Sequence, residues 1–207
     1  MRPHPSLPAI LILLLGFTAC TESNLAKVER TKYARVGFRQ HVDRPDSPIY
    51  ADSTSVVTGS VGGAFGLAGA LVATAVEVSR TAGPRDKGKS LVRAGKIDPA
   101  KSLSVHFRKE VEALGFFDTK SNNPDATFKL EIRYWGFGPG GGDNLNAVVS
   151  GEAQLVTPSG KVIWERDGLA EGDTEHTMEQ YVADPRLFEK SIDEATAKLA
   201  KRLTDLD

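Results

Sequence analysis

The chain has 207 residues, with 26 Lys and Arg against 27 Asp and Glu, so its formal net charge is -1. This balance excludes the basic field that draws proteins to nucleic acid, and the length suits one domain with accessory segments. The only cysteine, Cys20, excludes a disulfide within the chain, so the fold has to rest on its hydrophobic core.

An apolar stretch over residues 9–19 ends directly at the cysteine. It is shorter than the ~20 residues that span a bilayer, but it suits the core of a signal peptide. Its end, FTAC (residues 17–20), resembles the lipobox of bacterial lipoproteins, although Phe17 stands where leucine is usual. The resemblance implies removal of residues 1–19 and lipidation, including palmitate, at Cys20. The alternative is an ordinary secretory signal with an incidental cysteine.

The residue after the cysteine bears on the membrane to which the lipid is sorted. In bacterial lipoproteins an aspartate at this place retains the protein at the inner membrane, whereas this chain has Thr21. The resemblance therefore implies an outer-membrane lipoprotein that faces the periplasm. We expect residues 20–31 to form a polar tether between the lipid and a periplasmic domain over residues 32–207.

The first expected strand covers residues 32–42, KYARVGFRQHV. Apolar and polar residues alternate in it, so that Ala34, Val36 and Phe38 are expected to face inward. The pattern is typical of a strand buried on one face.

An uncharged, glycine-rich run, Val56–Val76, follows. On a helix it places small residues at a spacing that lets two backbones approach closely, and its length is near the ~20 residues of a membrane span. The residues concerned are Gly59 with Gly63, Gly62 with Gly66, and Ala70. Against a helix, each glycine costs about 1 kcal/mol relative to alanine. We expect self-association or membrane contact, with a buried or disordered loop as the alternative.

A basic stretch follows the run, and together they fill residues 53–97. We interpret these residues as a glycine-rich apolar segment and a basic linker inserted in the domain. The basic side suits anionic head groups, with a solvated linker as the alternative. A connection this long is rarely idle in a compact domain.

Two helices are marked by an aspartate N-cap followed by proline, at Asp98-Pro99 and Asp184-Pro185. Between them, alternation and turn residues predict three more strands over residues 128–134, 146–156 and 161–165. The order is β-α-β-β-β-α. A right-handed crossover makes the first strand pair parallel, and the hairpins make the other pairs antiparallel. We therefore expect an α+β fold: a mixed four-stranded sheet with both helices on one face, plus the glycine-rich apolar insertion.

Two aromatic residues near the end of the strand over residues 128–134 are the candidates for a partner or ligand surface. On strict alternation, Trp135 and Phe137 fall on the polar face with Glu131 and Arg133. The alternative is that the strand twists and the two rings pack under the glycine loop.

Other chemistry finds little support in the sequence. The glycines over residues 136–141 spell a dinucleotide fingerprint, but another strand follows instead of the required helix, so we interpret them as a hairpin loop. The histidines show no spacing typical of metal ligands, and no cofactor is expected. A hydrolase using Asp173 or His176 is a third hypothesis, which no motif favours.

Three phrases resemble a group of small Gram-negative envelope lipoproteins. They are EALGFFDTK (residues 112–120), ATFKLEIRYWGF (residues 126–137) and QLVTPSGKVIWERD (residues 154–167). The group includes the curli-secretion lipoprotein, the TolB N-terminal-like domains and the auxiliary lipoproteins of ABC-type transport systems. The glycine-rich insertion also resembles that of conjugation surface-exclusion lipoproteins, in which it falls elsewhere in the domain.

What the resemblance implies is a non-enzymatic accessory or scaffold subunit of an envelope assembly, secretion or transport complex. Such proteins are often oligomeric, so the expected partners are the membrane, through Cys20, and a second copy or another envelope protein. The alternative from another class is a monomeric periplasmic lipid- or ligand-binding lipoprotein that uses an aromatic sheet face.

Overall fold

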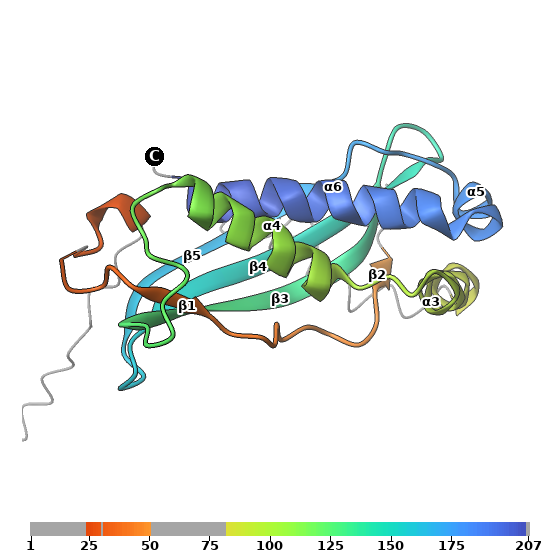
Figure 1. Cartoon of the computed structure of the whole chain (residues 1–207). Helices are drawn as coiled ribbons and strands as arrows, with labels where there is room; N and C mark the ends of the chain where they lie inside the picture. The colour runs from red at the N-terminus through yellow and green to blue at the C-terminus, as the bar shows by residue number, and fades with distance from the viewer. Residues whose placement is uncertain (1–23, 30, 51–81, 206–207) are drawn as a thin grey trace, which may run out of the picture.

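The structure is a computed structural model that describes residues 24–29, 31–50 and 82–205 (Figure 1). The predictions on Cys20 and on the glycine-rich run fall outside these residues and stay predictions. No helix in the described part of the chain is both long and apolar enough to cross a membrane.

A mixed sheet forms the centre of the domain. Its longest part is an antiparallel meander of β3 (Ala126–Pro139), β4 (Leu145–Val156) and β5 (Val162–Glu171). On the other edge of β3, β1 (Val36–Phe38) and β2 (Ile49–Tyr50) both pair parallel with it. The path through the sheet is β1-β3-β4-β5, with β2 beside β3.

The first predicted strand is shorter than expected and is followed by a second short one. Pairing along β3 stops after Phe38 and resumes at Ile49. Pro45 and Pro48 lie between the two strands and lack the N–H that a ladder needs. Between the two strands, an isolated parallel bridge still pairs Asp43 with Glu131 of β3.

The two predicted helices, α4 (Pro99–Ala113) and α6 (Pro185–Thr204), lie side by side over one face of the sheet (Figure 1). Both begin where the sequence indicates. The Asp98 carboxylate accepts hydrogen bonds from the backbone N–H groups of Ala100 and Lys101 at 3.1 and 3.3 Å. The Asp184 carboxylate accepts one from the N–H of Arg186 at 3.2 Å. Each cap satisfies donors that would otherwise lack a partner in the first turn.

The α+β class and the mixed sheet are confirmed, and the chain adds elements that the predicted order lacks. Besides β2 these are a 3-10 helix, η1 (Leu25–Lys27), and two helices, α3 (Ala82–Gly95) and α5 (Met178–Ala183). The stretch expected as a basic linker folds into α3, which buries Gly88 and Leu91. Within the expected polar tether, Leu25 and Val28 are buried in the core.

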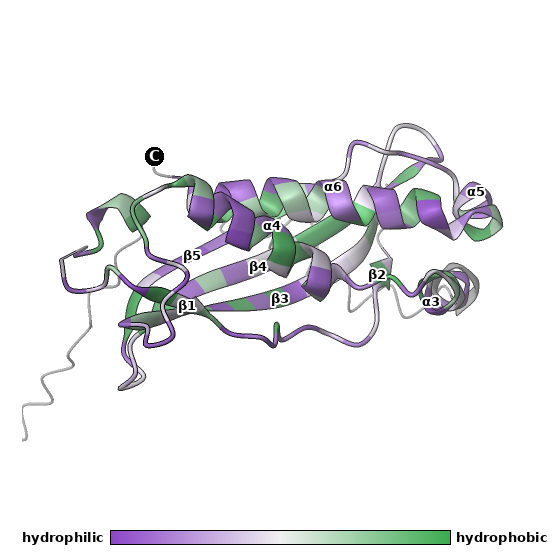
Figure 2. Ribbon diagram, viewed as in Figure 1, coloured by the Kyte–Doolittle hydropathy of each residue, from purple (hydrophilic) through white to green (hydrophobic). Residues whose placement is uncertain are grey.

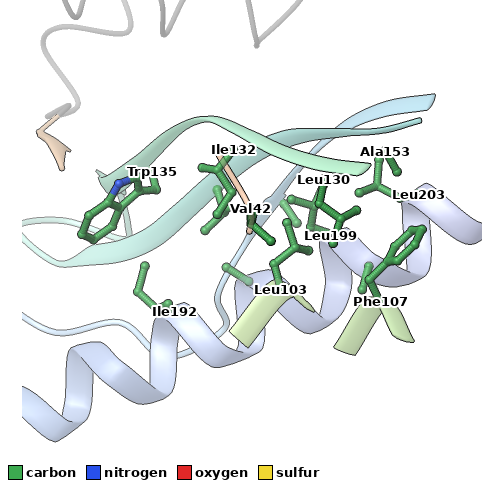
Figure 3. Close-up of a cluster of buried hydrophobic side chains, with 14 of the residues drawn as sticks. Val42, Leu103, Phe107, Leu130, Ile132, Trp135, Ala153, Ile192, Leu199 and Leu203 are labelled. Atoms are coloured by element: carbon green, nitrogen blue, oxygen red, sulfur yellow. The ribbon is translucent and has the colours of Figure 1, made fainter. Parts of the chain in front are cut away.

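The core fills the space between the sheet and the pair α4 and α6. Bands of hydrophobic and hydrophilic residues alternate along both helices (Figure 2), which is the amphipathic pattern of helices that cover a sheet. Leu103 and Phe107 of α4 and Leu199 of α6 face the inner side chains of β3 (Figure 3). The Phe128 ring packs edge-on against Phe107 at 5.3 Å between ring centroids.

Candidate functional site

The predicted aromatic surface does not form, because Trp135 and Phe137 are buried. Their side chains are 0% and 1% exposed. The reason is a β-bulge: Ile132 pairs with Gly151, whereas Tyr134 pairs with the next residue, Ser150. The extra residue reverses which side chains face the core from there on. Trp135 and Phe137 therefore share the inner face with Ile132, and the expectation of exposed rings is wrong.

Protein atoms surround both rings. The indole N–H of Trp135 donates a hydrogen bond to the carbonyl oxygen of Pro45 at 3.0 Å. The Phe137 ring stacks on Phe188 of α6 with 4.0 Å between centroids, and it lies 6.1 Å from the Tyr181 ring and 6.2 Å from the Tyr50 ring. Phe137 therefore ties β2, α5 and α6 to the end of β3.

The same bulge turns Tyr134 to the outer face of the sheet, away from α4 and α6. There Tyr134 and Val148 form a second, small hydrophobic cluster, with Ile49 of β2 and Leu169 of β5 packed against it. We call these four residues the outer patch.

A serine, a histidine and an aspartate meet between α4 and α6, but not in the order that a nucleophile needs. The Ser102 hydroxyl donates to Asp193 Oδ1 at 2.7 Å, and His106 Nε2 lies 2.9 Å from the same oxygen. In a catalytic triad the histidine stands between serine and carboxylate, so that it can take the serine proton. Here the carboxylate stands between the other two, and Thr196 is a further neighbour of Ser102. These hydrogen bonds link α4 to α6.

Electrostatics agree with this structural role. Partial burial alone raises the pKa of Asp193, but the hydrogen bonds from Ser102 and His106 outweigh it and leave the pKa below its ordinary value. An aspartate with a lowered pKa stays ionised, which suits an acceptor of hydrogen bonds and not a general acid.

Two clefts flank the N-terminus of α4, and both are lined by charges of both signs. One, of about 510 Å³, lies between α4 and α6 and is lined by Lys101, Lys190 and Glu189 among others. The second, of about 540 Å³, lies towards the β1–β2 connection and includes His41 and Asp46. Ser102 and Asp193 also line the first cleft, and in neither cleft does one sign of charge prevail.

The remaining candidates from the sequence are held in structural contacts. Asp173 forms an ion pair with Lys198 at 2.6 Å, and the His176 ring packs edge-on against Tyr181 at 5.5 Å. The glycines over residues 136–141 lie in β3 and in the turn to β4. Within the described ranges, no group of three His, Cys, Asp or Glu side chains is placed to hold a metal ion.

The arrangement of the two ends of the domain is the feature that alternation and motifs could not indicate. The 3-10 helix η1, which follows Cys20 in the chain, lies at one end of the sheet, and β2 and α3 lie at the opposite end (Figure 1). The segment between β2 and α3, residues 51–81, carries the glycine-rich run. Its two flanks come together around Phe137, because a Cβ at Gly88 of α3 would stand only 2.9 Å from the Phe137 ring.

Comparisons with known proteins add little. No family model matches the chain, and no curated protein matches it. Among solved structures it is similar to the crystal structure of protein XCC0632 from Xanthomonas campestris, described with the family model DUF330. The TM-score is 0.36 at 12% identity, over 49% of this chain and 56% of that chain. The chain thus matches little more than half of that protein, and so weak a likeness carries no argument about function.

Proposed function

We propose that this protein is an outer-membrane lipoprotein that acts as a non-enzymatic scaffold or accessory subunit of an envelope assembly, secretion or transport complex. Cys20 carries the lipid, and the glycine-rich run, centred on Gly59, Gly62, Gly63 and Gly66, joins copies of the chain. In this proposal β1, α4, β3, β4, β5 and α6 are the β-α-β-β-β-α core of the domain, and the glycine-rich segment is inserted in the connection between β1 and α4.

The placement of the two ends of the domain is the observation that carries the proposal. Leu25 is fully buried, so the folded domain begins five residues after Cys20. A fully extended chain of that length reaches at most about 18 Å. The η1 end of the domain is therefore held near the lipid, while β2 and α3, the flanks of the insertion, lie at the far end (Figure 1). An insertion that starts far from the anchor is well placed to meet another copy.

The same geometry weighs against the other hypotheses. The ligand-binding hypothesis requires Trp135 and Phe137 to be exposed on the sheet, but both rings are buried in the core. A triad-type hydrolase needs a histidine between the serine and the carboxylate, whereas here the Asp193 carboxylate stands between Ser102 and His106. These contacts favour a domain built for association.

Membrane extraction tests the anchor and the insertion separately. The variants are wild type, Cys20→Ser, and Cys20→Ser lacking Val56–Val76, each exported to the periplasm. We expect wild type to resist an alkaline carbonate wash, and both Cys20→Ser forms to be washed off, because the lipid is the only anchor that the proposal needs. The proposal fails if Cys20→Ser resists the wash and the deletion form does not, since the run would then be a membrane element.

A further inference from the structure

The solvent side of α3 carries a row of cations. Lys89 and Arg93 lie one helical turn apart, on the side opposite to Leu91, which packs on the core, and Lys96 follows directly after the helix. Arg93 and Lys96 are exposed, and Lys89 is partly exposed. Within the described part of the chain, none of these three side chains forms an ion pair.

This row is unfavourable within the isolated domain. Like charges one turn apart on a helix repel each other, and the helix dipole compensates only for Arg93, which lies in the last turn. Lys96 has a φ of 51°, in the left-handed region where glycine is favoured. Lys87 of the same helix, by contrast, pairs with Glu179 of α5 at 3.6 Å. A neighbouring anion would relieve the repulsion between Lys89 and Arg93.

At the same end of the domain, the segment between β5 and α5 projects acidic side chains. The N–H of Gly172 donates to a carbonyl oxygen of β4 at 2.9 Å, and His176 pairs with the start of β4 through two hydrogen bonds of 2.8 and 3.0 Å. The residues between them bulge away from the strand. Asp173 and Glu175 are exposed on this bulge, and Glu171, at the end of β5, is partly exposed.

The cations near this bulge balance only part of its charge. Lys198 pairs with Asp173 at 2.6 Å. The Glu175 carboxylate accepts a hydrogen bond from the N–H of Gly141 at 2.9 Å, in the turn that also carries the exposed Asp143. Among the described residues, this surface therefore keeps an excess of negative charge. We call residues 171–175 the acidic segment.

The cationic row and the acidic segment lie at one end of the domain but at opposite edges of the sheet. The helix α3 contacts β2, which pairs with β3 on one side, whereas the acidic segment continues β5, the last strand on the other side. Both lie at the end remote from η1 (Figure 1). Copies whose η1 ends are held at the same membrane can therefore present α3 of one copy to the acidic segment of the next.

We propose that the cationic side of α3, formed by Lys89, Arg93 and Lys96, docks on the acidic segment of a second copy. The contact is head-to-tail, because the two surfaces differ. Exposed ion pairs are individually weak and are screened by salt, so the contact sets which side each copy turns to its neighbour. The inference rests on the proposed self-association and adds its direction.

Zero-length crosslinking of the full-length lipoprotein in mild detergent tests the contact. A carbodiimide joins a lysine amine to a carboxylate only where the two groups meet, and the linked peptides are mapped by mass spectrometry. We expect links from Lys89 or Lys96 to the acidic segment in the dimer-sized product and not in the monomer-sized one. Lys109, which is exposed on α4, is the control and should form no such link.

The possible failures of this experiment can be told apart. Multimers without these links, or links confined to the monomer-sized product, would overturn the head-to-tail contact alone. A wild-type protein that stays monomeric would overturn the contact together with the proposed self-association.

Charge reversal tests the contact without a crosslinker. One double variant is Lys89→Glu with Arg93→Glu, and the other is Asp173→Lys with Glu175→Lys. We expect each to weaken association by about tenfold at low salt, measured by analytical ultracentrifugation, because like charges then face each other. The variant with all four changes should regain the wild-type association. Double variants that associate like wild type, or a fourfold variant as weak as the double ones, would overturn the proposal.

Discussion

Trp135→Ala lowers the free energy of unfolding by about 3–5 kcal/mol, the cost of deleting a large aromatic side chain from a packed core. The indole is fully buried, and its N–H donates to the carbonyl oxygen of Pro45. The variant therefore opens a cavity and also leaves a carbonyl between β1 and β2 without its donor. Chemical denaturation followed by far-UV circular dichroism measures the change.

Glu131→Ala is the matched control for this prediction. Glu131 precedes the bulge on the same strand and is exposed on the outer face. A change at such a position is expected to stay within about 0.5 kcal/mol. If Trp135→Ala cost as little as Glu131→Ala, the ring would lie on the surface and the bulge would be absent.

Gly136→Ala is expected to detach β2 from the sheet and to cost about 3 kcal/mol or more, from backbone strain and overpacking together. Gly136 has a φ of 150°, and a Cβ there would stand 2.1 Å from the carbonyl oxygen of Ile49, which is backbone and cannot rotate away. Hydrogen exchange at Ile49 and Tyr50 reports the detachment, and thermal unfolding reports the loss of stability.

Gly160→Ala separates the effect of backbone conformation from that of close approach. Gly160 also has a positive φ, 85°, but a Cβ there meets nothing within 4 Å. Its expected cost is only about 1–2 kcal/mol, with no change in exchange at β2. Equal losses in the two variants would contradict the close contact between β2 and Gly136.

The elements with strong local signals could be predicted from the sequence. Asp98 and Asp184 before proline place the helix starts, because cap chemistry is local. The stripe of Leu103, Phe107 and Val111 predicts the buried face of α4, and all three are buried. The turn before Lys161 separates two alternating runs, which predicts the β4–β5 hairpin.

What could not be predicted depends on non-local pairing. Nothing in the sequence marks Arg133 as the point where the bulge is inserted, so strict alternation assigned Trp135 to the wrong face. The one available signal was Gly136, since a glycine within a strand often marks a bulge or a close approach of backbone. The helix α3 is hard to recognise in the sequence because it is rich in charged residues and, among its described side chains, few apolar ones, such as Leu91 and Val92, pack against the core.

The candidate functional features also include some that the sequence predicts and one that only the fold shows. Cys20 and the glycine pairs are sequence patterns, and the chemistry that they imply needs no fold. Cys20 precedes one end of the domain, whereas the insertion starts from the other end. This placement could not be predicted, because it depends on the long meander and on the pairing of β2 at the far end of β3. This separation of the two ends makes self-association, rather than a second anchor, the role that we propose for the glycine-rich run.

The most direct test of that role is the molar mass of the purified lipoprotein in mild detergent, by light scattering after size exclusion. Wild type is compared with the double variant Gly62→Val, Gly66→Val, and with Gly62→Ala, Gly66→Ala as the matched control that keeps both residues small. We predict a multimer for wild type and for the alanine control, and a monomer for the valine variant, because bulky side chains keep two backbones apart. One common mass for all three proteins would contradict association through the glycine-rich run.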